Sequence, residues 1–203
     1  MIDVHPPHHA ANTLRDFLIH IATIVVGLLI AIGLEQSVEW VHHRHVVHVA
    51  RENIRIEMDA NRKLAVKNLA SIRRTEKNMQ DNIKLTQALA TDPHALRHGH
   101  MAFNFQWSSF TDSAWRTARD TGALALMPVD EVQGYADTYG QQGLVNAEAI
   151  KMFEDEPEAS APLVMTPDAK DMSAQDAHAL LLNATNIYLR LQTLEQLTDG
   201  LQD

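Results

Sequence analysis

The hydrophobic pattern begins with an apolar run near the N-terminus. Residues 17–34, FLIHIATIVVGLLIAIGL, are apolar apart from His20 and Thr23. As a helix, a run of this length rises by about 27 Å, close to the roughly 30 Å hydrocarbon core of a bilayer. We therefore expect a transmembrane helix over residues 13–38, preceded by a disordered tail at residues 1–12.

Two other interpretations of this run are a cleaved signal peptide and a buried helix of a soluble protein. The apolar core is longer than the roughly 7 to 15 residues of a signal peptide, and Glu35, Gln36 and Glu39 follow where a small-residue cleavage site is expected. A helix that packs on the core of a soluble protein usually keeps a polar face, whereas this run is apolar on all faces apart from His20 and Thr23. A retained membrane anchor is the favoured interpretation.

The pattern changes after the apolar run to an amphipathic one. No Gly or Pro occurs between residues 35 and 92, which predicts a long helical stalk over residues 39–92. Three asparagines, Asn61, Asn68 and Asn82, share one heptad register with Thr75 between them, and buried asparagine can specify helix register. Apolar positions along the predicted packing face are Val47, Ile54, Met58, Ala65, Leu69, Ile72, Met79 and Ile83.

The rest of the chain predicts shorter helices. We expect middle helices within residues 103–153, with Gly122 ending one of them at a positive φ, and a Pro-containing acidic linker at residues 154–172. A C-terminal helix follows at residues 173–201, where Ser173 and Asp176 form a capping box. The expected inner positions of the helix after Pro128 are Val132, Tyr135, Tyr139, Ile150 and Phe153. Those of the C-terminal helix are Ala177, Leu180, Ala184, Ile187, Leu191, Leu194, Thr198 and Leu201. The fold class is all-α, with a transmembrane helix continuing into a long stalk that packs with shorter helices as an elongated bundle.

Composition narrows the function classes. Acidic residues outnumber basic ones by 26 to 17, for a formal charge of -9, which argues against nucleic-acid binding. The absence of Cys excludes disulfides, thiolate metal ligands and Cys nucleophiles. No nucleotide-binding, hydrolase or metalloprotease motif is found, so we expect neither an enzyme nor a cofactor.

Small residues suggest a helix-packing face within the anchor. Thr23, Gly27 and Ala31 recur every four residues, and Gly33 and Ser37 repeat that spacing on a neighbouring face. Such spacing lets two membrane helices approach closely, although Gly and Ala are also common in membrane helices generally. Trp40 follows the run at a depth suited to an interfacial aromatic anchor.

Histidines and aromatic residues are the other candidate site residues. His42, His45 and His48 are spaced to present imidazoles on one side of a helix, as a metal site, a pH-responsive patch or simple interfacial polar residues. A second histidine group is His94, His98 and His100. Four aromatics could line a ligand pocket or pack in the core: Trp107, Trp115, Tyr135 and Tyr139.

Several segments resemble an uncharacterised class of small bacterial single-pass membrane proteins. These are GLLIAIGLEQSVEW at residues 27–40, the spacing of Glu57 to Asn61, WRTARDTGAL at residues 115–124 and YADTY at residues 135–139. The shared plan is a G-[IL]-L-I-A-[LI] anchor, a charged helical stalk and a Trp-to-Gly-Ala-Leu turn before a Tyr-containing helix. The resemblance implies this architecture and no activity.

The expected location is the bacterial inner membrane, with the lipid bilayer as one partner. The resemblance favours a periplasmic large domain, whereas Arg44, Arg51 and Arg55 after the anchor, against Arg15 before it, favour a cytoplasmic one. We expect a non-enzymatic helical protein that self-associates or serves as an accessory or scaffold subunit of a membrane assembly. The alternative is a ligand-, pH- or metal-sensing helical module that signals through a partner.

Overall fold

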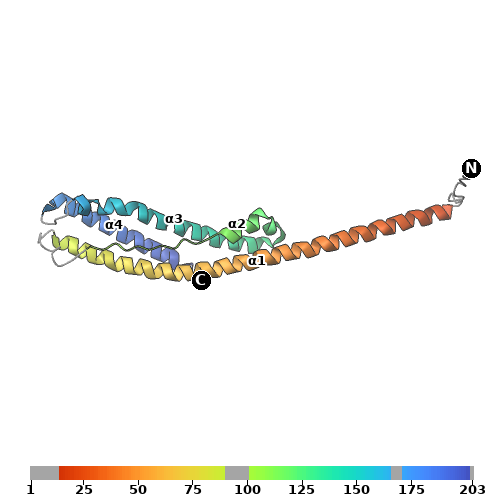
Figure 1. Cartoon of the computed structure of the whole chain (residues 1–203), viewed down its shortest axis with the longest axis horizontal. Coiled ribbons are helices and arrows are strands. Elements are labelled where there is room, and N and C mark those ends of the chain that lie inside the picture. Colours follow the sequence, from red (N-terminus) through yellow and green to blue (C-terminus); the bar gives the residue numbers. More distant parts are fainter. Residues whose placement is uncertain (1–13, 90–100, 166–170, 202–203) are drawn as a thin grey trace, which may run out of the picture. The chain divides into compact units, whose positions relative to one another are not determined.

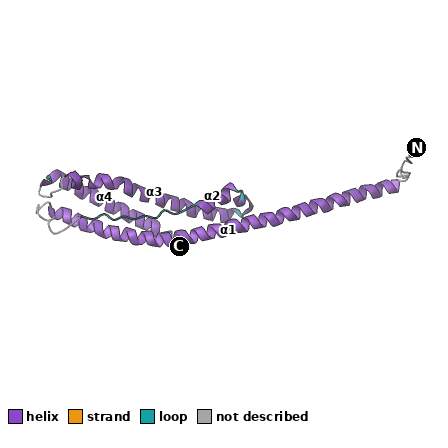
Figure 2. Cartoon of the chain, in the orientation of Figure 1, coloured by secondary structure: helices purple, strands orange, loops and turns teal. Residues whose placement is uncertain are grey.

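The protein is all-α. The computed structural model describes residues 14–89, 101–165 and 171–201, and no strand occurs in these ranges. Figure 2 shows helix throughout except for short connections and one longer extended stretch. The predicted tail at residues 1–12 and the histidines at positions 94, 98 and 100 lie outside the described residues.

The helices are α1 (Leu14–Leu89), α2 (Ser113–Asp120), a 3-10 helix η2 (Ala123–Leu126), α3 (Val129–Met165) and α4 (Ala174–Asp199). Helix α1 has 76 residues, because no Gly or Pro interrupts it beyond Gly33. The chain divides into two compact units, an N-terminal unit, Met1–Val49, and a bundle unit, Ala50–Asp203. Residues of α1 belong to both units.

In the bundle unit, the second half of α1 lies beside α3 and α4 (Figure 1). Helices α3 and α4 are antiparallel neighbours, and side-chain bonds join α1 to both: Arg51 to Glu131 on α3, and Arg73 to Glu195 on α4. The predicted packing faces are confirmed for α1 and α4, where Ile54, Ile72 and Leu191 are fully buried. Ser173 accepts a hydrogen bond from the Asp176 N–H, which confirms the predicted cap of α4.

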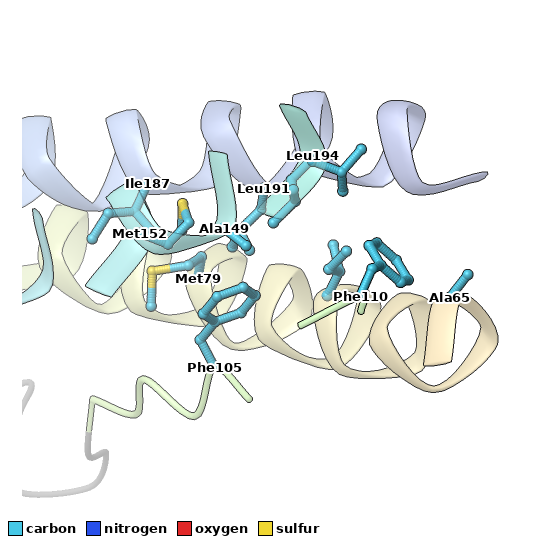
Figure 3. Packing of buried hydrophobic residues seen from close by; sticks show 11 residues of the cluster. Ala65, Met79, Phe105, Phe110, Ala149, Met152, Ile187, Leu191 and Leu194 are labelled. Atoms are coloured by element: carbon cyan, nitrogen blue, oxygen red, sulfur yellow. The ribbon is translucent and has the colours of Figure 1, made fainter. Parts of the chain in front are cut away.

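The core is a single cluster of side chains from α1, α3, α4 and residues 101–112. Figure 3 shows Met79, Met152, Ile187 and Leu191 gathered between the helices. The buried members of the cluster are Ala65, Ile72, Met79, Phe105, Phe110, Val145, Ala149, Met152, Ile187, Leu191 and Leu194. Burying a Val, Leu, Ile, Phe or Met side chain contributes about 1.5 to 3 kcal/mol, so this cluster stabilises the packing of the three helices and residues 101–112.

Two sequence expectations, the start of the linker and the inner face of α3, differ from the structure. Helix α3 continues to Met165, where a linker was expected from residue 154. Pro157 and Pro162 lie inside α3, and the neighbouring Glu, Ala, Leu and Met residues have high helix propensity that favours the helix despite the prolines.

The inner face of α3 also differs from the expected one. Ile150 is 51% exposed and Phe153 is 43% exposed, whereas Tyr139, Val145 and Ala149 are buried as expected of a core face. The buried face passes through Gln142, which is 6% exposed and hydrogen-bonds Asn61. A polar residue at an inward position shifted the apparent apolar stripe by one residue.

The turn between α2 and α3 follows the predicted chemistry. Gly122 has φ 76°, in the left-handed region that glycine adopts without steric cost. It ends the α2 segment, and η2 follows directly.

Candidate functional site

The feature that most distinguishes the bundle unit is an extended segment, residues 101–112, which we call the strap. It is the loop that runs along the helices between α1 and α2 in Figure 2. Within the strap, alternate residues are buried or half-buried, Phe103, Phe105 and Trp107, while Asn104 and Gln106 are exposed. This period of two is the pattern of an extended chain with one face on a core.

Three asparagines of α1 hold the strap by its backbone. Asn68 donates to the carbonyl of Ser108 at 2.9 Å and accepts from the N–H of the same residue at 3.0 Å. Asn61 does the same with Thr111, at 2.8 and 3.1 Å. Asn82 pairs with Ala102, at 3.0 and 3.1 Å. Each carboxamide therefore satisfies both backbone groups of one strap residue, which an extended chain presents on one side.

The spacing of the three asparagines on α1 explains why each of them reaches a residue of the strap. Seven residues of helix rise by about 10.5 Å, and three residues of extended chain cover about 10 Å. We call the row formed by Asn61, Asn68 and Asn82 with their strap partners the ladder. Over its length, the 21 residues from Asn61 to Asn82 span roughly 31 Å of helix, and the nine steps from Ala102 to Thr111 span roughly 30 Å of extended chain. The rise of the heptad repeat on α1 thus matches the rise of the extended strap from Ala102 to Thr111.

Other side chains fill the intervals of this ladder. Thr75 donates its hydroxyl to the carbonyl of Asn104 at 3.1 Å, and Ser71 accepts from the N–H of Gln106 at 3.1 Å. Asn61 and Asn68 are each 1% exposed and Thr75 is 0% exposed, so the ladder lies in the interior. Buried polar groups of this kind are costly when left unpaired, and here the strap backbone pairs them.

The opposite side of the strap is held by α3. Asn146 donates to the carbonyl of Phe110 at 3.0 Å and accepts from its N–H at 3.0 Å. Asn146 also accepts from the indole N–H of Trp107 at 3.2 Å. The strap is therefore held between α1 and α3 by four asparagines that contact main chain.

Two phenylalanines secure the strap to the core. Phe105 and Phe110 are each 7% exposed, and Figure 3 shows both rings within the core cluster. The ring of Phe105 lies 5.1 Å from that of Phe153, between centroids, and Trp107 contacts Phe110 edge-on at 5.6 Å. The site thus binds an extended polypeptide segment: asparagine side chains hydrogen-bond its backbone, and two of its aromatic side chains are buried in the core.

A second cluster joins α1, α2 and α3. The Glu57 carboxylate accepts from the Ala114 N–H at 3.0 and 3.1 Å, in the first turn of α2, and from the Tyr139 hydroxyl at 2.8 Å. Trp115 stacks on Tyr139 with centroids 5.6 Å apart. Burial, followed by the hydrogen bond to Glu57, raises the pKa of the Tyr139 phenol, so the phenol stays protonated as the donor.

Beside this cluster, Arg51 and Glu131 form a bidentate ion pair with both N···O distances 2.7 Å. The hydrogen bond from Arg51 lowers the pKa of the Glu131 carboxyl, and burial opposes that shift. Tyr135 donates its hydroxyl to Glu131 at 3.0 Å, and burial and this bond raise the pKa of the phenol. The pair connects α1 to α3.

The four predicted pocket aromatics fall into two places. Trp115, Tyr135 and Tyr139 lie together, with ring contacts from Trp115 to both tyrosines. Trp107 lies elsewhere, with Phe105, Phe110 and Asn146. The hydroxyls and the indole N–H described above bond to groups of the chain itself, which favours the packing interpretation of these residues.

In the N-terminal unit, α1 exposes its apolar residues. Among the described residues it is the one helix that is long and apolar enough to cross a membrane, and no residue of its most apolar 18-residue stretch is buried. Thr23 and Ser37 donate their hydroxyls to the carbonyls of Ile19 and Gly33, at 2.9 and 2.7 Å, so these polar groups are satisfied within the helix. A Cβ built on Gly27 or Gly33 would meet no atom within 4 Å.

The residues after the apolar run carry an aromatic–cation contact. The Arg44 guanidinium lies 4.7 Å from the centroid of the Trp40 ring, and Trp40 is 58% exposed. His43 lies 3.6 Å from Glu39. His42, His45 and His48 belong to no group of three or more potential ligands within the described part of the chain, so the structure gives the metal hypothesis no support.

The sequence did not identify Asn146, Ser71, Gln142 or the role of Glu57. A signal for the strap was present in the alternation Phe103-Asn104-Phe105-Gln106-Trp107, which has the period of an extended chain. A signal for Gln142 and Asn146 was their spacing of four on a helix otherwise expected to be apolar on that side.

One buried carboxylate oxygen in the bundle unit lacks a partner. Oε1 of Glu76 is inaccessible to solvent and makes no hydrogen bond with the described residues. Burial raises the pKa of the Glu76 carboxyl, the nearby Glu195 carboxylate raises it further, and Arg73 opposes them. Arg73 itself donates to Glu195 at 2.6 Å and lies 3.9 Å from Asp199.

We expect Glu76→Gln to stabilise the protein at neutral pH by about 1 kcal/mol, since it removes a poorly solvated charge. Because the folded-state pKa is raised, the stability linked to Glu76 is present below its unfolded pKa and is lost as pH rises through the folded pKa. The difference in unfolding free energy between Glu76→Gln and the wild type should therefore grow in favour of the variant as the pH rises from about 4 to about 7. Urea unfolding at both pH values measures this, and a constant difference would contradict it.

Comparison of the chain with known proteins gave no family: no protein-family model matches it, and no significant match was found among curated proteins or solved structures. The fold and the two sites therefore define its class, an all-α protein with one candidate membrane-spanning helix and an asparagine-held strap.

Proposed function

We propose that this protein is a membrane-anchored, non-enzymatic helical protein that self-associates or serves as an accessory subunit of a membrane assembly. The observation that carries the proposal is the exposed apolar segment of α1. Each large apolar residue from Phe17 to Leu34 is between 44% and 65% exposed. A surface of this kind is unfavourable in water and suited to lipid or to other membrane helices.

The remaining features fit a protein that binds proteins rather than one that catalyses a reaction. The polar side chains at the strap and at the Glu57 cluster are mostly paired within the chain, where they position helices. The proposed location is the bacterial inner membrane with the bundle unit in the periplasm, which rests on the resemblance of residues 27–40 and 115–124. Trp40 and Arg44 suit the polar edge of such a membrane.

Self-association through the anchor can be tested at Gly27. In a mild detergent, light scattering should give the wild-type chain the mass of an oligomer. Gly27→Leu should weaken the oligomer about tenfold or more, because the larger side chain separates two helix backbones. The substitution meets no atom of its own chain within 4 Å at the Cβ, so intrachain packing is preserved.

The matched control is Val25→Leu, on the opposite side of the same helix, which should leave the mass unchanged. A monomer for the wild type, with no protein co-purifying from native membranes, would rule out the proposed function.

A further inference from the structure

The stretch of α1 that follows the apolar run carries an exposed face with two apolar and three basic or titratable side chains. Trp40 and Val41 are 58% and 59% exposed, and Arg44, His45 and His48 are exposed as well. Trp40, Arg44 and His48 recur every four residues, and Val41 and His45 repeat that spacing one position on. All five therefore lie on one side of the helix. We call these five residues the basic face.

The acidic residues next to the apolar run lie on the other side of the helix. At roughly 100° of turn per residue, Glu35 and Glu39 lie about 150° and about 170° from the centre of the basic face. Glu39 lies 3.6 Å from His43, which is likewise outside the basic face. These two carboxylates therefore leave the charge of the basic face uncompensated.

The charged neighbours of His45 and His48 come from α1 itself, which is the one element in the described part of the N-terminal unit. The charged residues within four positions of either histidine are Arg44, Arg51 and Glu52. Arg51 bonds Glu131, and Glu52 accepts a hydrogen bond from Arg55 at 2.7 Å. The one carboxylate in this set is thus already bonded to an arginine, and an anion for the histidines has to come from outside α1.

Arg44 is folded back toward the apolar run. Its guanidinium lies 4.7 Å from the centroid of the Trp40 ring, one turn nearer the N-terminus. Trp40 follows Leu34 by about 9 Å of helix, and the polar headgroup layer on each side of a bilayer is roughly 5 to 8 Å thick. With residues 17–34 in the hydrocarbon core, the guanidinium reaches the depth of the lipid phosphates. Guanidinium binds phosphate oxygens in bidentate geometry.

We propose that the basic face binds the headgroups of anionic phospholipids, and that protonation of His45 and His48 strengthens this binding below neutral pH. The inference rests on the proposed membrane anchoring, because the anchor places residues 40–48 at the lipid surface. Histidine gains its charge between about pH 8 and about pH 5. The two histidines lie some 9 to 14 Å beyond the headgroup layer, roughly one to two Debye lengths, so they feel an attenuated surface potential.

The test measures which phospholipid the full-length chain retains. The protein is purified in dodecyl maltoside and equilibrated with micelles that carry equal amounts of phosphatidylglycerol and phosphatidylcholine. Lipid that stays bound through size exclusion is quantified by mass spectrometry. At about pH 7.5, we expect bound phosphatidylglycerol to exceed phosphatidylcholine about threefold through Arg44. At about pH 5.5, the ratio should rise by a further factor of about three, because two histidines become charged.

Variants of the basic face separate the two contributions. Arg44→Gln should remove the preference at about pH 7.5. The double variant His45→Gln with His48→Gln should keep that preference and lose its growth at about pH 5.5. The matched controls are Arg62→Gln, at an exposed arginine of α1 in the bundle unit, and His178→Gln, at an exposed histidine of α4. Both controls should behave as the wild type does, and circular dichroism checks that each variant is folded.

The outcomes separate this inference from the proposed function. Equal retention of the two lipids by the wild type, or equal effects of Arg44→Gln and Arg62→Gln, overturns headgroup binding by the basic face. Growth of the preference at low pH in the histidine double variant overturns the role of the histidines. A chain that stays in membranes after alkaline extraction but shows no lipid preference overturns this inference and leaves the anchor intact. A chain that is extracted overturns both.

Discussion

Replacing Asn68 with leucine is expected to lower the free energy of unfolding by about 2 to 4 kcal/mol. Leucine has a similar volume, so the main loss is the pair of hydrogen bonds to the N–H and C=O of Ser108. Both backbone groups would face an apolar side chain, and each unpaired group costs roughly 1 to 3 kcal/mol. For a domain stabilised by about 5 to 15 kcal/mol, this is a large fraction of the total.

The measurement is urea unfolding of the protein in detergent, followed by tryptophan fluorescence, since Trp107 lies on the strap. The matched control is Lys67→Ala, which removes an exposed side-chain contact to the same residue, Ser108. That variant should stay within about 0.5 kcal/mol of the wild type. Equal stabilities of the Asn68 variant and the wild type would show that the ladder does not hold the strap.

Periodic elements could be predicted from the sequence because burial follows their helical period. The stripe from Ile54 to Met79 on α1 and the stripe from Leu180 to Thr198 on α4 both lie inside the bundle unit. The asparagine register was also visible, since Asn61, Asn68 and Asn82 share a heptad position. In each case one local rule, the rise and turn of a helix, decides which side chains face inward.

The strap was harder to predict because two signals compete in it. Its aromatic residues alternate with Asn and Gln, as in an extended chain, but an isolated strand has no partner in an all-α chain. Its partner is a row of side-chain amides on α1, and no local rule of the strap sequence reveals that. The backbone N–H groups of Ala102, Ser108 and Thr111 are satisfied by residues 20 to 50 positions away in the sequence.

The inner face of α3 shows the same difficulty. Glutamine is usually found on the surface, yet Gln142 is buried, and its side chain accepts a hydrogen bond from Asn61. The predicted inner positions omitted Gln142 and included Ile150 and Phe153, which are 51% and 43% exposed. Polar residues that complete a buried network look like surface residues until their partners are known.

Two lysines in the middle of the apolar run, Val25→Lys with Leu29→Lys, should remove the protein from the membrane. Residues 17–34 contain twelve Leu, Ile, Val and Phe residues. At roughly 0.3 to 0.6 kcal/mol each, they favour insertion by about 4 to 7 kcal/mol. Each lysine near the helix centre costs about 2.5 to 3.5 kcal/mol, so two of them offset the whole gain.

The readout is the fraction of protein that stays with membranes after alkaline extraction, which should fall from most of the protein to a small remainder. Val25 and Leu29 lie on the side of the helix opposite Thr23, Gly27 and Ala31, so the small-residue face is unchanged in sequence. Val66→Lys is the matched control, at an exposed apolar position of the same helix in the bundle unit, and it should leave the membrane fraction unchanged. Retention of the double variant in the membrane would mean that residues 17–34 are not the anchor, because no helix of that composition inserts two central charges without losing most of its insertion energy.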